Sequence, residues 1–334
     1  MIKEMIAKIA EKENLTTEEM TGAFSEIFRG EATNAQIAAL ITSLRMKGET
    51  IEEITACANV MRDHGLPFEV EDELLEIVGT GGDGARTFNI STTSAFVLAA
   101  GGVKVAKHGN RSVSSKSGAA DVLEALGADI SPEVEKAKVQ LEKTNMVFLY
   151  AQKYHGAMRF AGPVRKEIGI RTVFNILGPL TNPAKATMQV MGVYDKALVE
   201  PLARVLSNLG VTKALVVNGD GLDEFSLTGT NTVAEIKNGT ITMFELTAEE
   251  VGLPACTKEE LVGGLGPDNA VITKAILTGE DKGAKRNTVL LNAGAGFYVA
   301  GKAASIKEGI ALAAETIDSG AALATMEKFI ALSK

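Results

Sequence analysis

The stretch IVGTGGDGARTFNIST, residues 77–92, indicates the fold of the chain more clearly than any other. An apolar run leads into it, and the run STTSAFVLAA leads out, which is the pattern of a strand, a glycine-rich turn and a helix. Such a turn presents free backbone N–H groups at the start of a helix, where they bind anions. Gly79, Gly81 and Gly84 also match the G-x-G-x-x-G spacing of dinucleotide-binding turns. The stretch therefore predicts a phosphate site.

The residues after the next expected strand disfavour a dinucleotide. A dinucleotide site requires an acidic residue about 20 residues further on, which would bind the ribose hydroxyls. The sequence there is GGVKVAKHGNRS, which offers Lys104, Lys107 and Arg111 instead. On this stretch alone, a glycine turn that only lets the helix pack on the strand remains an alternative.

A second loop, KHGNRSVSSKSG at residues 107–118, also lies between an expected strand and an expected helix. It contains three cationic residues and four serines but no acidic residue, and all of these side chains donate hydrogen bonds to phosphate oxygens. An ordinary solvated loop is the alternative. Two such loops at adjacent strand ends favour a ligand with two separate phosphate groups.

An acid pair supplies a candidate metal site. Asp223 and Glu224 are adjacent in the glycine-flanked loop NGDGLDEFSLTG, residues 218–229. Mg²⁺ binds through one or two carboxylates together with substrate phosphates and water. The Ser91 hydroxyl at the expected helix start could add a further ligand. Taken alone, the acid pair would fit an ordinary surface loop better.

Composition excludes several classes of protein. The net charge of −8 over 334 residues disfavours nucleic acid or an anionic membrane as a partner, so phosphate binding must come from a local pocket. Cys57 and Cys256 are far apart, so neither a disulfide framework nor a zinc site is predicted. The first residues are charged throughout and no apolar run is long enough to span a bilayer. We therefore expect a cytoplasmic protein.

The spacing of apolar residues predicts two domains. Residues 1–66 indicate a helical domain, because three S/T-x-x-E/Q capping boxes at Thr16, Thr33 and Thr50 each precede an apolar stripe. Residues 72–334 alternate strands and helices and predict an α/β domain with a mostly parallel sheet. Residues 155–184 interrupt this alternation, and we expect part of them to rejoin the helical domain at a hinge.

Several shorter elements are predicted within the α/β domain. Expected strands are residues 74–78, 103–106, 146–151, 188–194 and 213–219, followed by a hairpin around Asn238 and Gly239. One helix is expected to end at Gly101 and another at Gly127. A further helix is expected to have Ser131 as its N-cap and Pro132 at its first position. The last 40 or so residues are expected to be helical.

Taken together, these stretches resemble the anthranilate phosphoribosyltransferases, and the resemblance runs nearly end to end. The motifs that carry it are GTGGD (79–83), FNIST (88–92), KHGNRSVSSKSG (107–118), ADVLEALG (120–127), PVRKEIGIRTVFNILGPLTNPA (163–184) and DEFS (223–226). The resemblance implies a small N-terminal helical domain joined to a larger α/β domain with a mostly parallel central sheet. It also implies an active site at the hinge and a homodimer formed through the helical domain.

The implied reaction belongs to tryptophan biosynthesis. Anthranilate would displace pyrophosphate from C1 of phosphoribosyl pyrophosphate, with Mg²⁺, to give N-(5-phosphoribosyl)anthranilate. The positions implied for phosphoribosyl pyrophosphate are Gly79, Gly82, Asp83, Thr87, Asn89, Ile90, Ser91, Thr92, Lys107, His108, Gly109, Asn110, Arg111, Ser112, Val113, Ser114 and Ser115. Those implied for anthranilate are Gly79, His108, Asn110, His155, Gly178, Pro179 and Arg165, the last as partner of its carboxylate. Those implied for Mg²⁺ are Ser91, Asp223 and Glu224.

No essential general base is expected, because an aromatic amine need not lose its proton before it attacks. Its proton could pass to water or to the released pyrophosphate. Three positions depart from the usual pattern of the family, which commonly has serine in place of Ala119 and proline in place of Gln152 and Gly156. We expect a missing hydroxyl contact at the first position and a less rigid loop at the other two.

Two other functions compete with this interpretation. A pyrimidine nucleoside phosphorylase of the same fold would bind inorganic phosphate and would not need the acid pair. The stretch IRTVFNILGPLTNP, residues 170–183, and the acid pair favour the transferase. A non-catalytic relative that binds nucleic acid would require a basic face, which the net charge of −8 opposes.

Overall fold

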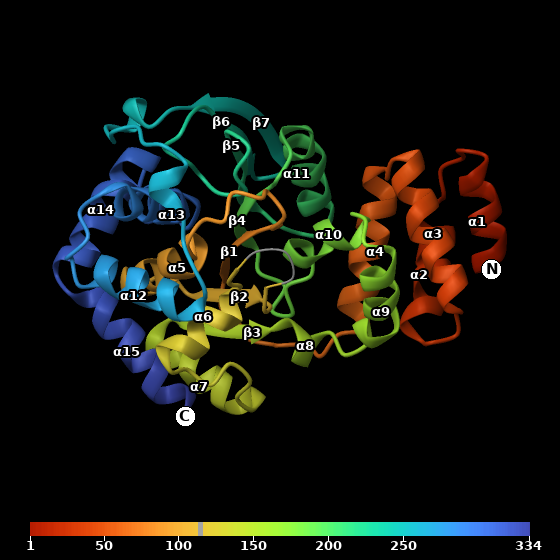
Figure 1. Ribbon diagram of the computed structural model, residues 1–334, viewed down its shortest axis with the longest axis horizontal. Coiled ribbons are helices and arrows are strands. Elements are labelled where there is room, and N and C mark those ends of the chain that lie inside the picture. The colour runs from red at the N-terminus through yellow and green to blue at the C-terminus, as the bar shows by residue number, and fades with distance from the viewer. Residues whose placement is uncertain (113–115) are drawn as a thin grey trace.

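The computed structural model describes residues 1–112 and 116–334. A bundle of helices forms one end of the molecule and a larger α/β body forms the other (Figure 1). Val113, Ser114 and Ser115, which the resemblance assigns to the phosphate site, lie outside the described residues. No helix in the described ranges is both long enough and apolar enough to cross a bilayer.

The structure contains helices throughout its length. They are α1 (Ile2–Ala10), α2 (Thr17–Phe28), α3 (Asn34–Lys47), α4 (Ile51–Asp63), α5 (Ile90–Ala100), α6 (Ala119–Leu126), α7 (Val134–Thr144), α8 (Ala151–Tyr154), α9 (Met158–Ile168), α10 (Phe174–Leu177), α11 (Val199–Asn208), α12 (Gly266–Leu277), α13 (Ala284–Val299), α14 (Ile306–Asp318) and α15 (Ala321–Ser333).

The strands form one sheet of seven, in the order β3-β2-β1-β4-β5-β6-β7. Strands β1 to β5 are parallel, whereas β6 and β7 continue the sheet as an antiparallel hairpin. The mostly parallel sheet predicted from the sequence is therefore confirmed. The strands are β1 (Leu75–Gly79), β2 (Val105–Gly109), β3 (Met146–Tyr150), β4 (Met188–Gly192), β5 (Lys213–Gly219), β6 (Asn231–Lys237) and β7 (Thr240–Leu246).

The N-terminal helices begin where their capping boxes predict. In each of α2, α3 and α4, the threonine side chain accepts from the N3 backbone N–H, and the N3 side chain accepts from the threonine N–H. Helices α9 and α10 pack on this bundle, and their Ala161, Val164 and Phe174 belong to its buried core. The Phe174 ring stacks on Phe24 with centroids 5.2 Å apart.

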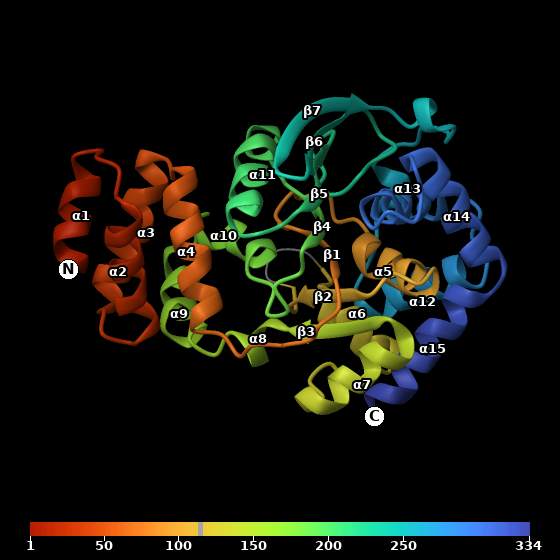
Figure 2. The same ribbon diagram turned by 180° about the vertical axis from the view of Figure 1, so that it is seen from behind.

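Helices cover both faces of the sheet. Helices α5 and α13 bury the face that carries Leu75, Ile77 and Val105. Helix α11 covers the other face, beside Ala214 and Val216, and separates the sheet from α4 (Figures 1 and 2). The chain therefore passes from β1 to a helix on one face, and from β4 to a helix on the opposite face.

Most predicted boundaries hold to within one or two residues, and two show where local signals fail. The helix expected to start after Ser131 begins at Val134 with Glu133 as N-cap. The carbonyl of Pro132 accepts from Lys153 Nζ instead of starting the helical ladder. The strand expected at residues 103–106 runs over β2, so that Lys107 and His108 lie within the sheet and not in the loop. The hairpin at Asn238 and Gly239 is confirmed.

The bundle contains a buried ion pair that supports a prediction. Lys47 Nζ lies 2.8 Å from Glu53 Oε2, and their side chains are 5% and 1% exposed. The Lys47→Met variant would leave the Glu53 carboxylate buried without a counter-charge, so we expect urea unfolding to show a loss of about 3 kcal/mol. Arg29→Met, which removes an exposed pair with Glu31, is the matched control and should leave the midpoint unchanged. Equal midpoints for the two variants would contradict this account.

Candidate active site

The acid pair lies directly on the ends of three parallel strands. Strands β1, β4 and β5 end in Gly79, Gly192 and Gly219. A β-carbon on Gly192 would lie 1.6 Å from the carbonyl oxygen of Asp223, and one on Gly219 would lie 2.2 Å from that of Glu224. A β-carbon on Gly79 would lie 2.2 Å from Asp223 Oδ2. Only glycine at these ends lets the loop approach so closely.

This position is the topological switch point of the sheet. The helices that follow β1 and β4 leave toward opposite faces, and ligands of open α/β sheets bind in the crevice that this creates at the carboxyl ends of the strands. Gly192 and Gly219 were not anticipated from the sequence. A usable signal was present, because a glycine lies within or directly after three of the expected strands, in EIVG, QVMG and VVNG.

The glycine loop adds backbone donors and a third carboxylate. Its Gly81 N–H donates to Asp223 Oδ2 at 2.6 Å. Burial and the nearby charge of Asp83 raise the pKa of Asp223, and burial together with Asp223 raises the pKa of Glu224. Asp83 Oδ2 is buried and has no hydrogen-bond partner among the described residues. Three neighbouring carboxyl groups thus share a site in which one of their oxygens, Asp83 Oδ2, has no donor among the described residues.

Lys107 brings a positive charge into the same place from β2. Its side chain is buried, and its Nζ donates to the carbonyl of Ile77 at 2.8 Å and to Ser91 Oγ at 3.1 Å. Burial lowers the pKa of Lys107, while the Glu224 carboxylate opposes that shift. The structure therefore brings together Ser91, Lys107 and Glu224, which the sequence places far apart.

Asn89 joins the two loops predicted to bind phosphate. Its Nδ2 donates to the carbonyl of Ser117 at 3.3 Å, and its Oδ1 accepts from Ser117 Oγ at 3.0 Å. Asn269, at the start of α12, donates to the same Oδ1 at 2.8 Å. Asn89 immediately precedes α5, so this network fixes the helix start whose N–H groups would bind an anion. Asn269 was not anticipated from the sequence.

Two other members of the expected phosphate set, Arg111 and Asn110, make hydrogen bonds to residues outside the acid pair. The guanidinium of Arg111 is paired with Glu124 and donates to the Tyr150 hydroxyl at 3.3 Å, so it is already engaged by other side chains of the protein. Asn110 Oδ1 accepts from the Arg111 N–H at 2.8 Å and from Gln152 Nε2 at 3.3 Å.

Two buried histidines form an apolar corner beside residues 178–181. The rings of His108 and His155 meet edge to face with centroids 5.0 Å apart. His108 Nδ1 lies 3.2 Å from the carbonyl of Gly178, and His155 Nε2 lies 2.9 Å from that of Thr181. Burial, and to a lesser degree the neighbouring His155, lowers the pKa of His108 to about 3, so its ring is neutral.

In the segment 178–181, beside the histidines, every backbone carbonyl accepts a hydrogen bond from a side chain. Besides the two histidine contacts, Gln189 Nε2 donates to the carbonyl of Pro179 at 2.7 Å. Arg62 Nε, from the end of α4, donates to that of Leu180 at 2.9 Å. Gly178 and Pro179, both expected to line the anthranilate pocket, are therefore fixed in position.

Arg165 of α9 is the remaining expected anthranilate residue. Its guanidinium lies 5.0 Å from the centre of the Phe174 ring, and burial lowers its pKa. It makes no ion pair with any carboxylate of residues 1–112 or 116–334. A half-buried cation without a counter-charge is suited to binding an anionic ligand.

The donor set fits a magnesium ion that is completed by substrate. Among the described residues, no group of three or more His, Cys, Asp or Glu side chains is arranged to hold a metal by itself. Mg²⁺ needs only one or two protein carboxylates when phosphates and water supply the rest. Burial and the neighbouring carboxylates raise the pKa values of Asp223 and Glu224, and Asp83 Oδ2 has no partner among the described residues, so a cation bound here would be stabilised by all three carboxylates.

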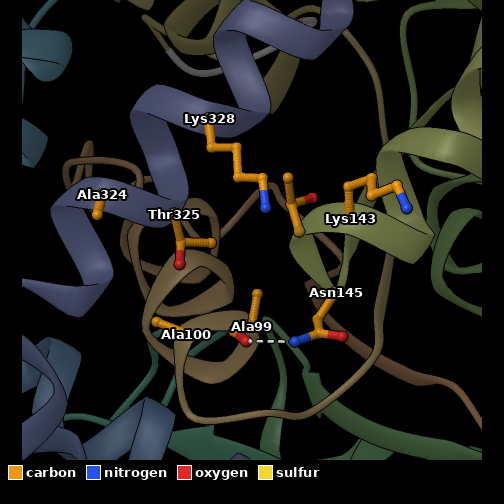
Figure 3. Close-up of a pocket in the computed structure, with 8 residues that line it drawn as sticks. Ala99, Ala100, Lys143, Asn145, Ala324, Thr325 and Lys328 are labelled. Atoms are coloured by element: carbon orange, nitrogen blue, oxygen red, sulfur yellow. Dashed lines mark hydrogen bonds between the residues drawn. The ribbon is translucent and has the colours of Figure 1, made fainter.

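A hollow of about 180 Å³ elsewhere is not part of this site (Figure 3). It lies between the ends of α5 and α7 and the helix α15, where Asn145 Nδ2 donates to the carbonyl of Ala99 at 3.2 Å. Asn145 immediately precedes β3, so this hollow is at the amino ends of the strands, opposite the acid pair.

Comparison with known families defines the class of protein. The family model described as "Glycosyl transferase family, helical bundle domain" matches residues 3–65. The model described as "Glycosyl transferase family, a/b domain" matches residues 71–323. The helical bundle and the α/β domain are thus those of this glycosyl transferase family.

Individual relatives narrow the class. An anthranilate phosphoribosyltransferase of Methanobrevibacter smithii is 56% identical over 99% of this chain and 98% of its own length. The crystal structure of the Thermus thermophilus enzyme of that name superposes with a TM-score of 0.94 at 45% identity, covering 98% of this chain and 99% of the other. One from Saccharomyces cerevisiae, in complex with PRPP and Mg, gives 0.91 at 29% identity, covering 99% and 97%. The chain belongs to the anthranilate phosphoribosyltransferase family.

The low pKa of His108 predicts a pH-dependent stability. Between pH 6.5 and about 3, the unfolded chain binds a proton at this histidine that the folded protein does not. The free energy of unfolding should therefore fall as the pH is lowered through this range. Between pH 7 and 5.5, His108→Gln should lose about 1 kcal/mol less than the wild type. Urea unfolding at both pH values measures this, with the exposed His64→Gln as control. Parallel pH profiles for wild type and His108→Gln would refute the assignment.

Proposed function

We propose that this protein transfers the phosphoribosyl group of phosphoribosyl pyrophosphate to anthranilate, giving N-(5-phosphoribosyl)anthranilate and pyrophosphate in tryptophan biosynthesis. The observation that carries the proposal is the seating of Asp223 and Glu224 on three strand ends, beside a glycine loop and the start of α5. Relatives about half identical over the full chain are named for this activity.

The departure of pyrophosphate builds negative charge on the leaving group. The protein would stabilise this charge with donors and cations that are already in position around it. The N–H groups of the glycine loop and of the α5 start, with Lys107, would bind phosphate oxygens. We assign the phosphate role to the whole set implied by the resemblance, although Arg111 would first have to leave Glu124. When bound, Mg²⁺ would neutralise phosphate charge, and Ser91, Asp223 and Glu224 would hold it.

Anthranilate would bind between the two parts of the molecule. Arg165 would pair with its carboxylate, while His108 and His155 would line its ring together with Gly178 and Pro179. A histidine whose pKa is about 3 is too weak a base to take the amine proton at neutral pH. This supports a mechanism without an essential side-chain base, in which the proton leaves to water or to pyrophosphate.

The domain arrangement belongs to the same proposal. We assign residues 1–66 and part of residues 155–184 to a helical domain and residues 72–334 to the α/β domain, with the active site at the hinge. The packing of α9 and α10 on the bundle supports this division. We further propose a homodimer formed through the helical domain and a cytoplasmic location, as the resemblance implies.

The first test is the loss of anthranilate fluorescence when the pure protein is mixed with anthranilate, phosphoribosyl pyrophosphate and Mg²⁺. We expect a loss that requires both substrates and that EDTA abolishes. The control is the same mixture without phosphoribosyl pyrophosphate. If the folded protein leaves the fluorescence unchanged but splits thymidine with inorganic phosphate, the transferase assignment is wrong and the phosphorylase is correct.

Substitution of Arg165 tests the acceptor site separately. In Arg165→Gln, loss of a charge-assisted contact with the carboxylate should raise the KM for anthranilate about 10- to 100-fold. The KM for phosphoribosyl pyrophosphate should stay within about threefold, because that substrate uses other residues. Arg159→Gln, on an exposed position of the same helix, is the matched control. An equal rise in both KM values for Arg165→Gln would show that this residue does not select the carboxylate.

A further inference from the structure

Asn292 holds the backbone of Phe225, next to the acid pair, through two hydrogen bonds. Its Oδ1 accepts from the Phe225 N–H at 3.1 Å, and its Nδ2 donates to the Phe225 carbonyl at 2.8 Å. The same Nδ2 donates to the carbonyl of Thr288 one turn earlier in α13 at 2.9 Å, which fixes the side chain to its own helix. Both Asn292 and Phe225 are fully buried.

Asn231 makes the same kind of contact with Ser226, the residue that follows Phe225. Its Oδ1 accepts from the Ser226 N–H at 2.7 Å, and its Nδ2 donates to the Ser226 carbonyl at 2.9 Å and to that of Leu246 at 3.0 Å. This asparagine begins β6 and is fully buried. Two side-chain amides from different elements thus hold two consecutive backbone units.

These contacts replace secondary structure at the acid pair. Residues 223–226 belong to no helix or strand. A carboxamide can bind both the N–H and the carbonyl of one residue, because it offers a donor and an acceptor in one plane. Neither alanine nor serine can supply both bonds, and the freed N–H and carbonyl of Phe225 would remain buried. The loop is also held by the buried Phe225 side chain, by its contacts with the strand-end glycines and by the Gly81 N–H, but of these only the Gly81 contact is a hydrogen bond to the acid pair itself.

We infer that Asn292 and Asn231 are positioning residues that set where the Asp223 and Glu224 carboxylates stand, and thereby the affinity for a divalent cation. This inference rests on the proposed function, because it takes the acid pair to be the metal site. Residues that contact metal ligands without touching the metal orient those ligands. Removing such a residue commonly weakens metal binding about 10- to 100-fold.

The test measures the metal directly. Mn²⁺ binding to the protein with saturating phosphoribosyl pyrophosphate and no anthranilate can be followed by electron paramagnetic resonance. Asn292→Ser and Asn231→Ser should each raise the Mn²⁺ dissociation constant at least about tenfold. The matched control is Gln140→Ala, which also removes a buried amide donor to a carbonyl, that of Phe329 at 2.9 Å, but in α7, which is not part of the site. It should leave Mn²⁺ binding within about twofold of wild type.

A second measurement needs no variant that might fail to fold. In the wild-type protein without metal, the Phe225 and Ser226 amides should exchange with D₂O at least about a thousandfold more slowly than an unprotected amide. Rapid exchange of both amides would overturn the inference, as would folded serine variants that bind Mn²⁺ as tightly as wild type. If wild type itself binds no Mn²⁺ in the presence of phosphoribosyl pyrophosphate, the metal role in the proposed function fails instead.

Discussion

The contact between the backbone of residues 223–224 and the ends of β1, β4 and β5 is the constraint on which the site depends. It requires glycine at Gly79, Gly192 and Gly219, because any β-carbon there would overlap the loop. Since these strands are neighbours in the sheet, the loop spans the switch point and holds both carboxylates over it. The start of α5 and the glycine loop then face these carboxylates across a short distance.

This arrangement explains how an acidic protein can bind a ligand rich in phosphate. Net charge acts over the whole surface, whereas a buried site responds to the groups that line it. Here Lys107 and the backbone N–H groups oppose three carboxyl groups, and burial shifts the pKa values of Lys107, Asp223 and Glu224 toward their neutral forms. A divalent cation with its phosphates would supply the missing charge on both sides. The site is therefore complementary to a metal-bound phosphate and not to a free anion.

Sequence reasoning recovered the features that depend on short spacing. The capping boxes, the glycine loop and the alternation of strands and helices are local patterns, and the helices and strands match them closely. It ended the strand at residue 106 and placed Lys107 in the following loop, yet β2 extends to Gly109 and brings Lys107 to the site from within the sheet. It missed Asn292 and Asn231, because the first contacts a backbone unit 67 residues away and a single asparagine in a helix or strand forms no pattern. Such residues become visible only when the fold brings them to the site.

The anchoring of the carbonyls of Gly178, Pro179, Leu180 and Thr181 limits how the two parts of the molecule can move. Two of the four side chains, His108 and Gln189, lie on strands β2 and β4, and His155 follows α8. The fourth is Arg62, which also donates to the carbonyl of Leu209 at 3.1 Å. A rotation of the bundle that keeps both Arg62 bonds would leave Arg62 near its axis, because Leu180 and Leu209 would stay beside it. In such a rotation each point on α9 would move in proportion to its distance from the axis, and the Arg165 guanidinium would move with it. A small angular change at Arg62 would set how far this charge stands from a bound aromatic acid.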